Sequence, residues 1–195
     1  MKKLLLTIAM VVAGFTANAQ EKGGFEKQDW FISGSAGFNS VSQEGGSDLT
    51  TFTFSPSVGY FVSENIALEL ALIIGSSTTE TMGFQADIDQ TGASLSGNYF
   101  FTPENNFSFT LGAGLSYTSV TTDMDGFGEF DSNVFSIAVA PGINYFISEN
   151  FALRASLAAL SYSNESIDVD GAPSTNSFGL NLNLSDINFG LTYKF

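Results

Sequence analysis

Large apolar residues recur at every second position along most of this chain. A period of two places successive side chains on opposite faces of a β-strand. No segment after the N-terminus reaches the roughly 18 consecutive apolar residues that a membrane-spanning helix needs. The apolar positions are Phe52, Phe54, Pro56, Val58, Tyr60, Val62; Ile66, Leu68, Leu70, Leu72, Ile74; Phe107, Phe109, Leu111, Ala113, Leu115, Tyr117; Phe135, Ile137, Val139, Pro141, Ile143, Tyr145, Ile147; Phe151, Leu153, Ala155, Leu157; and Ile187, Phe189, Leu191, Tyr193, Phe195.

The face opposite these apolar residues is small and polar, as in Ser108, Thr110, Gly112, Gly114 and Ser116. A soluble β-sandwich also alternates, but its outward faces usually carry charged side chains. Only 13% of this chain is charged. Small residues suit a narrow lumen and large apolar ones suit lipid, where the backbone must be fully paired and a sheet must close. The pattern therefore predicts an all-β chain folded as a transmembrane barrel.

An internal repeat indicates the number of strands. Residues 56–72 read PSVGYFVSENIALELAL, residues 141–157 read PGINYFISENFALRASL, and residues 98–107 form a third copy. Each copy reads as strand, short turn and strand, so we predict an eight-stranded antiparallel up-and-down β-barrel. Its strands are expected at 29–41, 51–62, 66–76, 91–101, 107–118, 133–147, 151–162 and 186–195.

Longer polar segments lie between these hairpins, at roughly 42–50, 76–90, 119–132 and 162–177, and hold most of the acidic residues. Short turns at one end and long loops at the other are typical of bacterial outer-membrane barrels, whose short turns and termini lie in the periplasm. Two apolar groups break the parity of the strands that follow them, and we expect strand extensions joined through β-bulges. They are Phe84, Ala86, Ile88; and Phe178, Leu180, Leu182, Leu184.

The N-terminus has the features of a cleavable signal peptide. Lys2 and Lys3 precede an apolar stretch from Leu4 to Phe15, and Ala17-Asn18-Ala19 forms an A-x-A cleavage site. We expect a signal peptide at 1–19 and a barrel domain at 20–195. The alternative is a retained signal anchor.

The charge balance excludes several partners and chemistries. After removal of the signal peptide, four Lys and Arg face 20 Asp and Glu, which gives a formal charge of −16. Nucleic acid is therefore not an expected partner, because its recognition demands basic patches. The chain contains no Cys, so disulfides and lipoprotein anchoring are not expected.

Aromatic residues with a polar edge gather near the strand ends. Tyr60, Tyr99, Tyr145 and Tyr193 precede the short turns or the chain end, and Trp30 begins the first strand. Such rings sit at the headgroup level of a membrane, so we predict a periplasmic aromatic belt. Ordinary hairpin packing is the alternative.

With these features the chain resembles the small outer-membrane β-barrel proteins of the OmpA/OmpX type, a porin-like family. The resemblance covers the whole expected mature chain. It implies the bacterial outer membrane as location, its lipid bilayer as surroundings, and a C-terminal signal for the barrel-assembly machinery in Leu191, Tyr193 and Phe195. The soluble periplasmic domain of longer members is not expected.

Enzymatic activity is not expected. Outer-membrane barrel enzymes, as families, rely on His paired with Ser or Asp, and this chain contains no His. No carboxylate pair in an expected cleft replaces it. We expect no catalytic residue and no cofactor.

Two charges within the expected strands occupy equivalent places in the repeat. Glu69 follows Ile66-Ala67-Leu68 and Arg154 follows Phe151-Ala152-Leu153, both on the inward parity. An eight-stranded lumen is just wide enough to be filled by side chains. We predict a bidentate Glu69–Arg154 ion pair across the lumen. It would act as a plug or, alternatively, as a gate for small ions.

The acidic segments contain D-x-D steps at 87–89, 123–125 and 168–170. Oxygen ligands at this spacing suit divalent cations, but the full EF-hand spacing is absent. We therefore expect a solvated acidic surface and no metal site. The partner that we expect for these acidic loops is an extracellular ligand.

The sequence thus predicts an outer-membrane barrel with a structural or surface-interaction role and a lumen plugged by side chains. The first alternative is a narrow porin-like channel for ions or small solutes, including small hydrophobic molecules. The second is a soluble β-sandwich or secreted adhesin, which would lack pairing between its first and last strands.

Overall fold

The computed structural model of the chain describes residues 23–41, 47–81, 84–156, 159–168, 173–180 and 188–195. The predicted signal peptide at 1–19 lies outside these residues and remains a prediction. The strands are β1 (Trp30–Val41), β2 (Ser47–Phe61), β3 (Ile66–Thr81), β4 (Phe84–Phe100), β5 (Phe107–Met124), β6 (Gly128–Phe146), β7 (Phe151–Ser156), β8 (Leu160–Ile167), β9 (Thr175–Leu180) and β10 (Asn188–Lys194).

The strands form one closed antiparallel sheet. Each of β1 to β6 pairs with the next, and β1 also pairs with β10, from Phe31 opposite Lys194 to Ser35 opposite Gly190. Both β7 and β8 pair with β6, so they are two segments of the seventh strand. In the same way, β10 pairs with β7 and β9 pairs with β8, so β9 and β10 are two segments of the eighth strand. The ten strand segments therefore make up eight strands. The predicted eight-stranded up-and-down barrel is confirmed. The pairing between first and last strands excludes the soluble β-sandwich.

The seventh strand contains a shift of one residue. Gly142 of β6 faces Ser156 of β7, whereas Val139, three residues earlier, faces Leu160 of β8, four residues later. The extra residue moves the outward parity from Leu153 in β7 to Leu160 in β8, as a β-bulge does.

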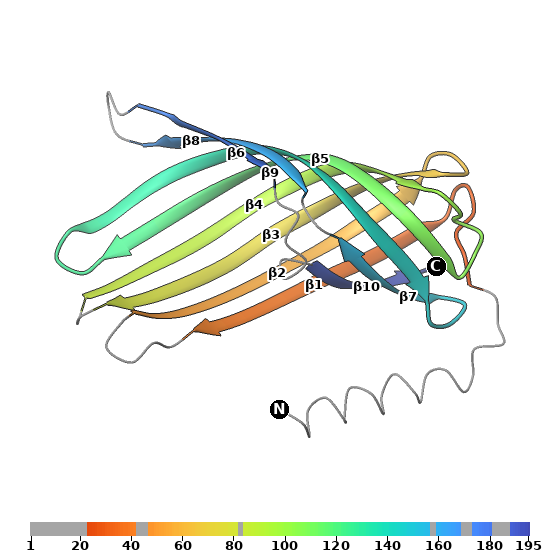
Figure 1. Cartoon of the computed structure of the whole chain (residues 1–195), viewed down its shortest axis with the longest axis horizontal. Coiled ribbons are helices and arrows are strands. Elements are labelled where there is room, and N and C mark those ends of the chain that lie inside the picture. The colour runs from red at the N-terminus through yellow and green to blue at the C-terminus, as the bar shows by residue number, and fades with distance from the viewer. Residues whose placement is uncertain (1–22, 42–46, 82–83, 157–158, 169–172, 181–187) are drawn as a thin grey trace, which may run out of the picture.

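The two ends of the barrel differ in construction. The short turns and the C-terminus lie at the right-hand end of Figure 1, and the longer hairpins lie at the left-hand end. We call these the short-turn end and the hairpin end.

The wall carries its large apolar side chains on the outside. In β3 the burial alternates strictly from Ile66 to Ile74, with Leu68, Leu70 and Leu72 exposed and Ala67, Glu69 and Ala71 turned inward. Such a continuous exposed apolar surface is typical of a wall that faces lipid. This sheet, rather than a central core, therefore organises the fold.

No helix in the described ranges is long and apolar enough to cross a membrane.

Two of the segments predicted as loops are strands instead. Residues 76–81 of β3 pair with residues 84–89 of β4, and the β5–β6 pairing continues from Ser119 opposite Asn133 to Met124 opposite Gly128, with Gly126 in the turn between them. Those two glycines have φ values of 81° and 85°, which suit the tight turn at the tip. The loop prediction was wrong because segments that contain several Thr residues favour strand pairing even outside the apolar wall. The strand extension predicted at Phe84, Ala86 and Ile88 is confirmed, since β4 begins at Phe84. The segments 42–50 and 162–177 also lose their predicted loop boundaries, since β2, β8 and β9 extend into them.

The parity change predicted before the fourth strand has no bulge. The register between β3 and β4 is unbroken from Thr81 opposite Phe84 to Ile66 opposite Tyr99. Phe84, Ala86 and Ile88 therefore share the inward parity of the strand. Phe178 and Leu180 point outward in β9, whereas Leu182 and Leu184 lie outside the described residues.

Candidate functional site

Strand alternation places the two predicted lumen charges inside the barrel. Glu69 lies in β3 between the exposed Leu68 and Leu70, and Arg154 lies in β7 next to the exposed Leu153. Neighbouring residues of a strand point to opposite faces, so both charges must point inward.

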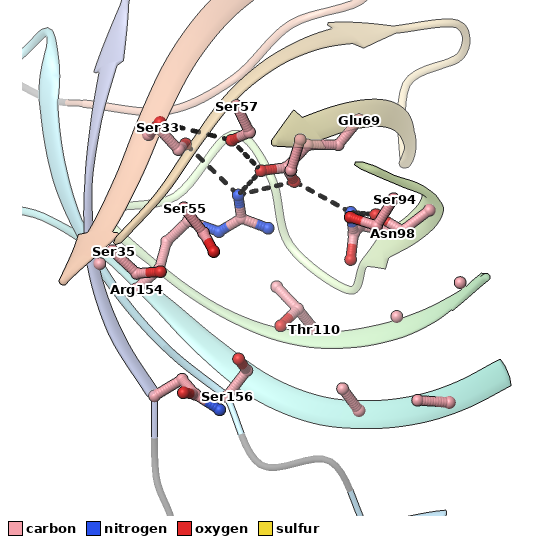
Figure 2. Close-up of a pocket in the computed structure, with 18 of the residues that line it drawn as sticks. Ser33, Ser35, Ser55, Ser57, Glu69, Ser94, Asn98, Thr110, Arg154 and Ser156 are labelled. Atoms are coloured by element: carbon pink, nitrogen blue, oxygen red, sulfur yellow. Dashed lines mark hydrogen bonds and ion pairs between the residues drawn. The ribbon is translucent and has the colours of Figure 1, made fainter. Parts of the chain in front are cut away.

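The structure brings these two side chains together across the lumen, as Figure 2 shows. Arg154 Nη1 lies 2.9 Å from Glu69 Oε2 and 3.1 Å from Glu69 Oε1. One nitrogen thus contacts both carboxylate oxygens, and the two-nitrogen fork expected from the sequence is not formed. Their side chains are 19% and 11% exposed, so the pair is largely shielded from solvent.

Polar neighbours from other strands satisfy the carboxylate. Ser57 donates to Glu69 Oε1 at 2.6 Å, and Asn98 donates to Glu69 Oε2 at 3.1 Å. Arg154 Nη1 also reaches Ser33 Oγ at 3.5 Å. We call these five residues the lumen network. It ties five strands to one point in the lumen, and its carboxylate is hydrogen-bonded as a buried charge requires.

Between the lumen network and the short turns, five phenylalanine side chains fill the short-turn end of the barrel. Each is at most 2% exposed. They come from the segment before β1 and from β1, β2, β4 and β6. We call them the aromatic plug: Phe25, Phe31, Phe61, Phe100 and Phe146.

Phe25 is the centre of this aromatic plug. Its ring centroid lies 5.3 Å from that of Phe31, 4.7 Å from that of Phe61, 5.5 Å from that of Phe100 and 4.9 Å from that of Phe146. Each such aromatic pair contributes about 0.5–1.5 kcal/mol beyond the burial of its area.

Small residues opposite the inward rings make room for them. Phe31 faces Gly59, Phe61 faces Ala67, and Phe146 faces Ala152 across the sheet. A Cβ atom on Gly59 would lie 2.0 Å from the Phe31 ring. Glycine is therefore required at this place by close approach.

The aromatic plug also supports the lumen network. The Arg154 guanidinium carbon lies 5.7 Å from the centroid of the Phe31 ring and 5.8 Å from that of Phe100. Both distances are within cation–π range. The two layers are therefore stacked on each other at the short-turn end.

On the side of the lumen network that faces the hairpin end, the lumen contains a cavity of about 320 Å³. Its wall carries many hydroxyl groups, and Figure 2 shows several of them around the ion pair. The labelled serines and threonine are Ser33, Ser35, Ser55, Ser57, Ser94, Ser156 and Thr110. The cavity can hold water or a small solute beside the ion pair.

The predicted belt residues lie on the outside of the short-turn end. Trp30 pairs with Tyr60 across the sheet, with ring centroids 4.8 Å apart. Tyr99 and Tyr145 are each 43% exposed in β4 and β6. All four are on the outward parity of their strands.

The three residues predicted as an assembly signal also point outward. Leu191 and Phe195 are exposed. Tyr193 packs between Phe151, at 4.9 Å, and Phe195, at 5.3 Å between centroids. Phe195 N donates to Trp30 O, which fixes the last residue against the first strand.

The hairpin end carries carboxylates on the outer face of its strands. Asp87 of β4 faces Asp123 of β5, which faces Glu129 of β6. We call these three the acidic row. Like charges directly opposite destabilise a sheet. Thr78 and Gln85 donate to Asp87, each at 2.7 Å.

In the ranges that the structure describes, no three acidic side chains converge into a metal-binding group. Of the D-x-D steps, the one at 168–170 lies largely outside these ranges.

The tips of the two hairpins carry exposed apolar side chains. Phe84 is 64% exposed, Met124 36% and Phe127 85%. The three residues line one small pocket of about 170 Å³, and we call them the tip patch. Their surroundings are acidic, because Asp125 also lines this pocket.

Sequence reasoning missed the aromatic plug, although a signal was present. In each repeat a tyrosine is followed directly by a phenylalanine, as in Tyr60-Phe61, Tyr99-Phe100 and Tyr145-Phe146. Because adjacent residues of a strand point to opposite faces, a belt tyrosine outside requires a phenylalanine inside.

Comparison with known proteins agrees with this architecture. A family model described as "Outer membrane protein beta-barrel domain" matches residues 7–195. No curated protein sequence matches the chain.

Solved structures of small barrels are similar in fold. The outer membrane protein OprG from Pseudomonas aeruginosa is 18% identical, with a TM-score of 0.55 over 88% of this chain and 98% of that chain. The N-terminal β-barrel domain of OprF from the same species is 16% identical, with a TM-score of 0.53 over 87% and 100%. Outer membrane protein W of E. coli is 19% identical, with a TM-score of 0.51 over 87% and 99%. Likeness at these identities shows the fold alone.

Proposed function

This chain belongs to the outer membrane protein β-barrel family and is located in the bacterial outer membrane, and we propose that it is a closed barrel that acts through the surface of its hairpin end. In this arrangement the short turns and termini lie in the periplasm and the long hairpins lie outside the cell. The lipid bilayer surrounds the apolar wall. The protein performs no catalysis.

The tip patch is the observation that carries the surface-interaction role. Phe84 and Met124 are exposed although they lie on the inward parity of β4 and β5, and Phe127 lies in the turn after β5, so lipid does not explain them. Exposed apolar groups with a polar rim are typical of protein interaction sites. Thr79, Gln85 and Asp125, which line the same pocket, supply part of that rim.

The closed short-turn end supports a scaffold rather than an open channel. The aromatic plug and the lumen network both cross the lumen there. The cavity next to the ion pair favours the second candidate, a narrow channel for ions or small solutes, because its wall is lined with hydroxyl groups.

The outward aromatic residues support the proposed membrane position and assembly. Trp30, Tyr60, Tyr99 and Tyr145 would sit at the periplasmic headgroup level. Leu191, Tyr193 and Phe195 would be the contact of the last strand with the barrel-assembly machinery. Their outward direction leaves them accessible to such a partner.

The proposed function is tested by comparing conductance with adhesion. In a planar bilayer, the inserted wild-type protein is expected to give no discrete conductance steps. Cells that display the protein are expected to adhere to protein-coated or polysaccharide-coated surfaces, and Phe127→Ser should reduce this adhesion. The matched control is Phe109→Ser, which removes an exposed phenylalanine from the lipid-facing wall. Steady conductance, with adhesion unchanged in Phe127→Ser, would favour the channel instead.

A further inference from the structure

Residues 23–29 form a strap that is separate from the barrel wall. The strap precedes β1, whose pairing with β2 begins at Trp30 and with β10 at Phe31. It lies at the short-turn end, where the chain enters the first strand (Figure 1). The ladder that closes the barrel therefore does not include the strap.

The strap inserts one side chain into the lumen. Phe25 is 1% exposed and touches rings from four strands, whereas Glu26, Lys27 and Gln28 are exposed. Only Phe25 of these four residues contributes to the seal.

The backbone before Phe25 passes very close to the wall. A Cβ atom on Gly23 would lie 2.5 Å from Phe146 Cβ, and one on Gly24 would lie 2.7 Å from Glu104 O. A side chain at either position would push the strap away from the opening of the lumen at the short-turn end, which we call the mouth. The two glycines are therefore what allow the ring to be seated.

A small number of noncovalent contacts hold the strap in place. Phe25 N donates to Pro103 O at 2.8 Å, and Gln28 N donates to Phe61 O at 3.0 Å. Lys194 Nζ donates to Gly24 O at 2.7 Å and lies 3.8 Å from Asp29 Oδ2. Phe61 N also donates to Asp29 O at 3.0 Å, so residues 28 and 29 stay attached to β2. The contacts of residues 23–27 can break without opening a pair of wall strands, so this part of the strap can leave as a unit.

We propose that the strap is a releasable plug that closes the periplasmic mouth in series with the Glu69–Arg154 pair. This inference rests on the proposed closed lumen and deepens it. With Phe25 seated, the mouth is filled whether or not the ion pair is intact. With Phe25 withdrawn, the ion pair above still blocks the lumen. Small ions pass only when both layers are open.

Four proteins test the series arrangement by planar-bilayer conductance. They are the wild type, Phe25→Ala, the double variant Glu69→Ala/Arg154→Ala, and the triple variant. The double variant removes both charges, so that no unpaired charge stays in the lumen. The wild type and Phe25→Ala are expected to be silent, the double variant is expected to show only brief openings when the strap leaves, and the triple variant is expected to conduct steadily. Phe109→Ala, which truncates a lipid-facing ring, is the matched control for loss of a phenylalanine.

Tryptic cleavage after Lys27 measures the seating of the strap without any conductance. Cleavage of a folded segment follows the population of its open form. Loss of the Phe25 ring should raise the cleavage rate by roughly two to three orders of magnitude, from the usual cost of truncating a buried phenylalanine. Lys194→Met leaves the rings in place and should raise the rate about tenfold, from the loss of a charged hydrogen bond. Phe109→Ala should not change it.

A silent triple variant that is shown to be folded and inserted would overturn the proposal. So would full conductance in Phe25→Ala alone or in the double variant alone, because two seals in series do not allow it. Equal cleavage rates in the wild type and Phe25→Ala would show that the strap is not held by its ring. Conductance of the wild type would refute the closed lumen, while the cleavage comparison would still decide whether the strap is seated.

Discussion

Removal of Glu69 and Arg154, singly and together, measures how strongly the two charges are coupled. At an effective dielectric constant of 20, unit charges 4 Å apart attract by about 4 kcal/mol. Part of this is lost to desolvation, since the side chains are only 11% and 19% exposed. The cavity above the pair admits water and reduces the remainder.

We expect each single substitution to alanine to lower the free energy of unfolding by about 3 kcal/mol, because the remaining charge loses its partner in a shielded site. The double substitution should cost about 4 kcal/mol, which leaves a coupling energy of about 2 kcal/mol. Ser57→Ala, which removes one neutral donor to the carboxylate, should cost only about 1 kcal/mol.

The assay is urea unfolding of the protein folded in lipid vesicles, followed by the fluorescence of Trp30. This residue is the sole tryptophan of the chain and lies on the outer face of the first strand. Equal slopes of unfolding free energy against urea concentration would show that each variant exposes the same surface area on unfolding. A coupling energy below about 0.5 kcal/mol would refute the reasoning, because that value is typical of a solvated surface pair.

Two further substitutions, each with a matched control, test the packing and the membrane position of the wall. Gly59→Ala places a Cβ atom 2.0 Å from the Phe31 ring and should lower the free energy of unfolding by about 1–3 kcal/mol. The control Gly34→Ala has open space around its Cβ atom and should cost little. Equal losses of thermal stability in the two variants would contradict the role of the aromatic plug. Leu70→Arg puts a charge on the lipid-facing wall and should lower the free energy of unfolding in vesicles by about 2–4 kcal/mol. The control Glu80→Arg, near the hairpin end of the same strand, should cost less than about 1 kcal/mol. Similar costs in the two variants would place the membrane elsewhere.

The ion pair shows how far parity reasoning reaches. Equivalent places in the repeat put Glu69 and Arg154 on the inner face, and the small width of an eight-stranded barrel makes their contact expected. The single-nitrogen geometry was not predictable. It depends on the cation–π position of the guanidinium over Phe31 and Phe100 and on the contact of Nη1 with Ser33.

The aromatic plug shows where the same reasoning stopped. The inward direction of Phe61 follows from the outward direction of Tyr60, and this step was available from the sequence. That the rings meet at one level depends on the stagger between neighbouring strands, which periodicity does not contain. The insertion of Phe25 from outside the repeat was likewise beyond any local pattern.

The hairpin end was predicted incorrectly for a physical reason. Its strands lie beyond the apolar belt, so their outer face no longer carries the lipid-facing signal that identified the other strands. Asp87 and Asp123 lie on the outside of the wall, while Phe84 and Met124 lie on its inner parity. The inversion of polarity resembled loops in the sequence, although the hydrogen-bonded ladder continues through it.

The sequence by itself determined that the chain forms eight strands, that its large apolar residues face outward, and that no histidine or cysteine chemistry is present. These properties follow from local periodicity and from composition. Only the tertiary structure decided the one-residue shift in the seventh strand, the extent of the hairpins, the level at which the rings and the ion pair meet, and the entry of the strap into the lumen. Each of these depends on the register between strands far apart in the chain, which closure of the barrel sets as a whole.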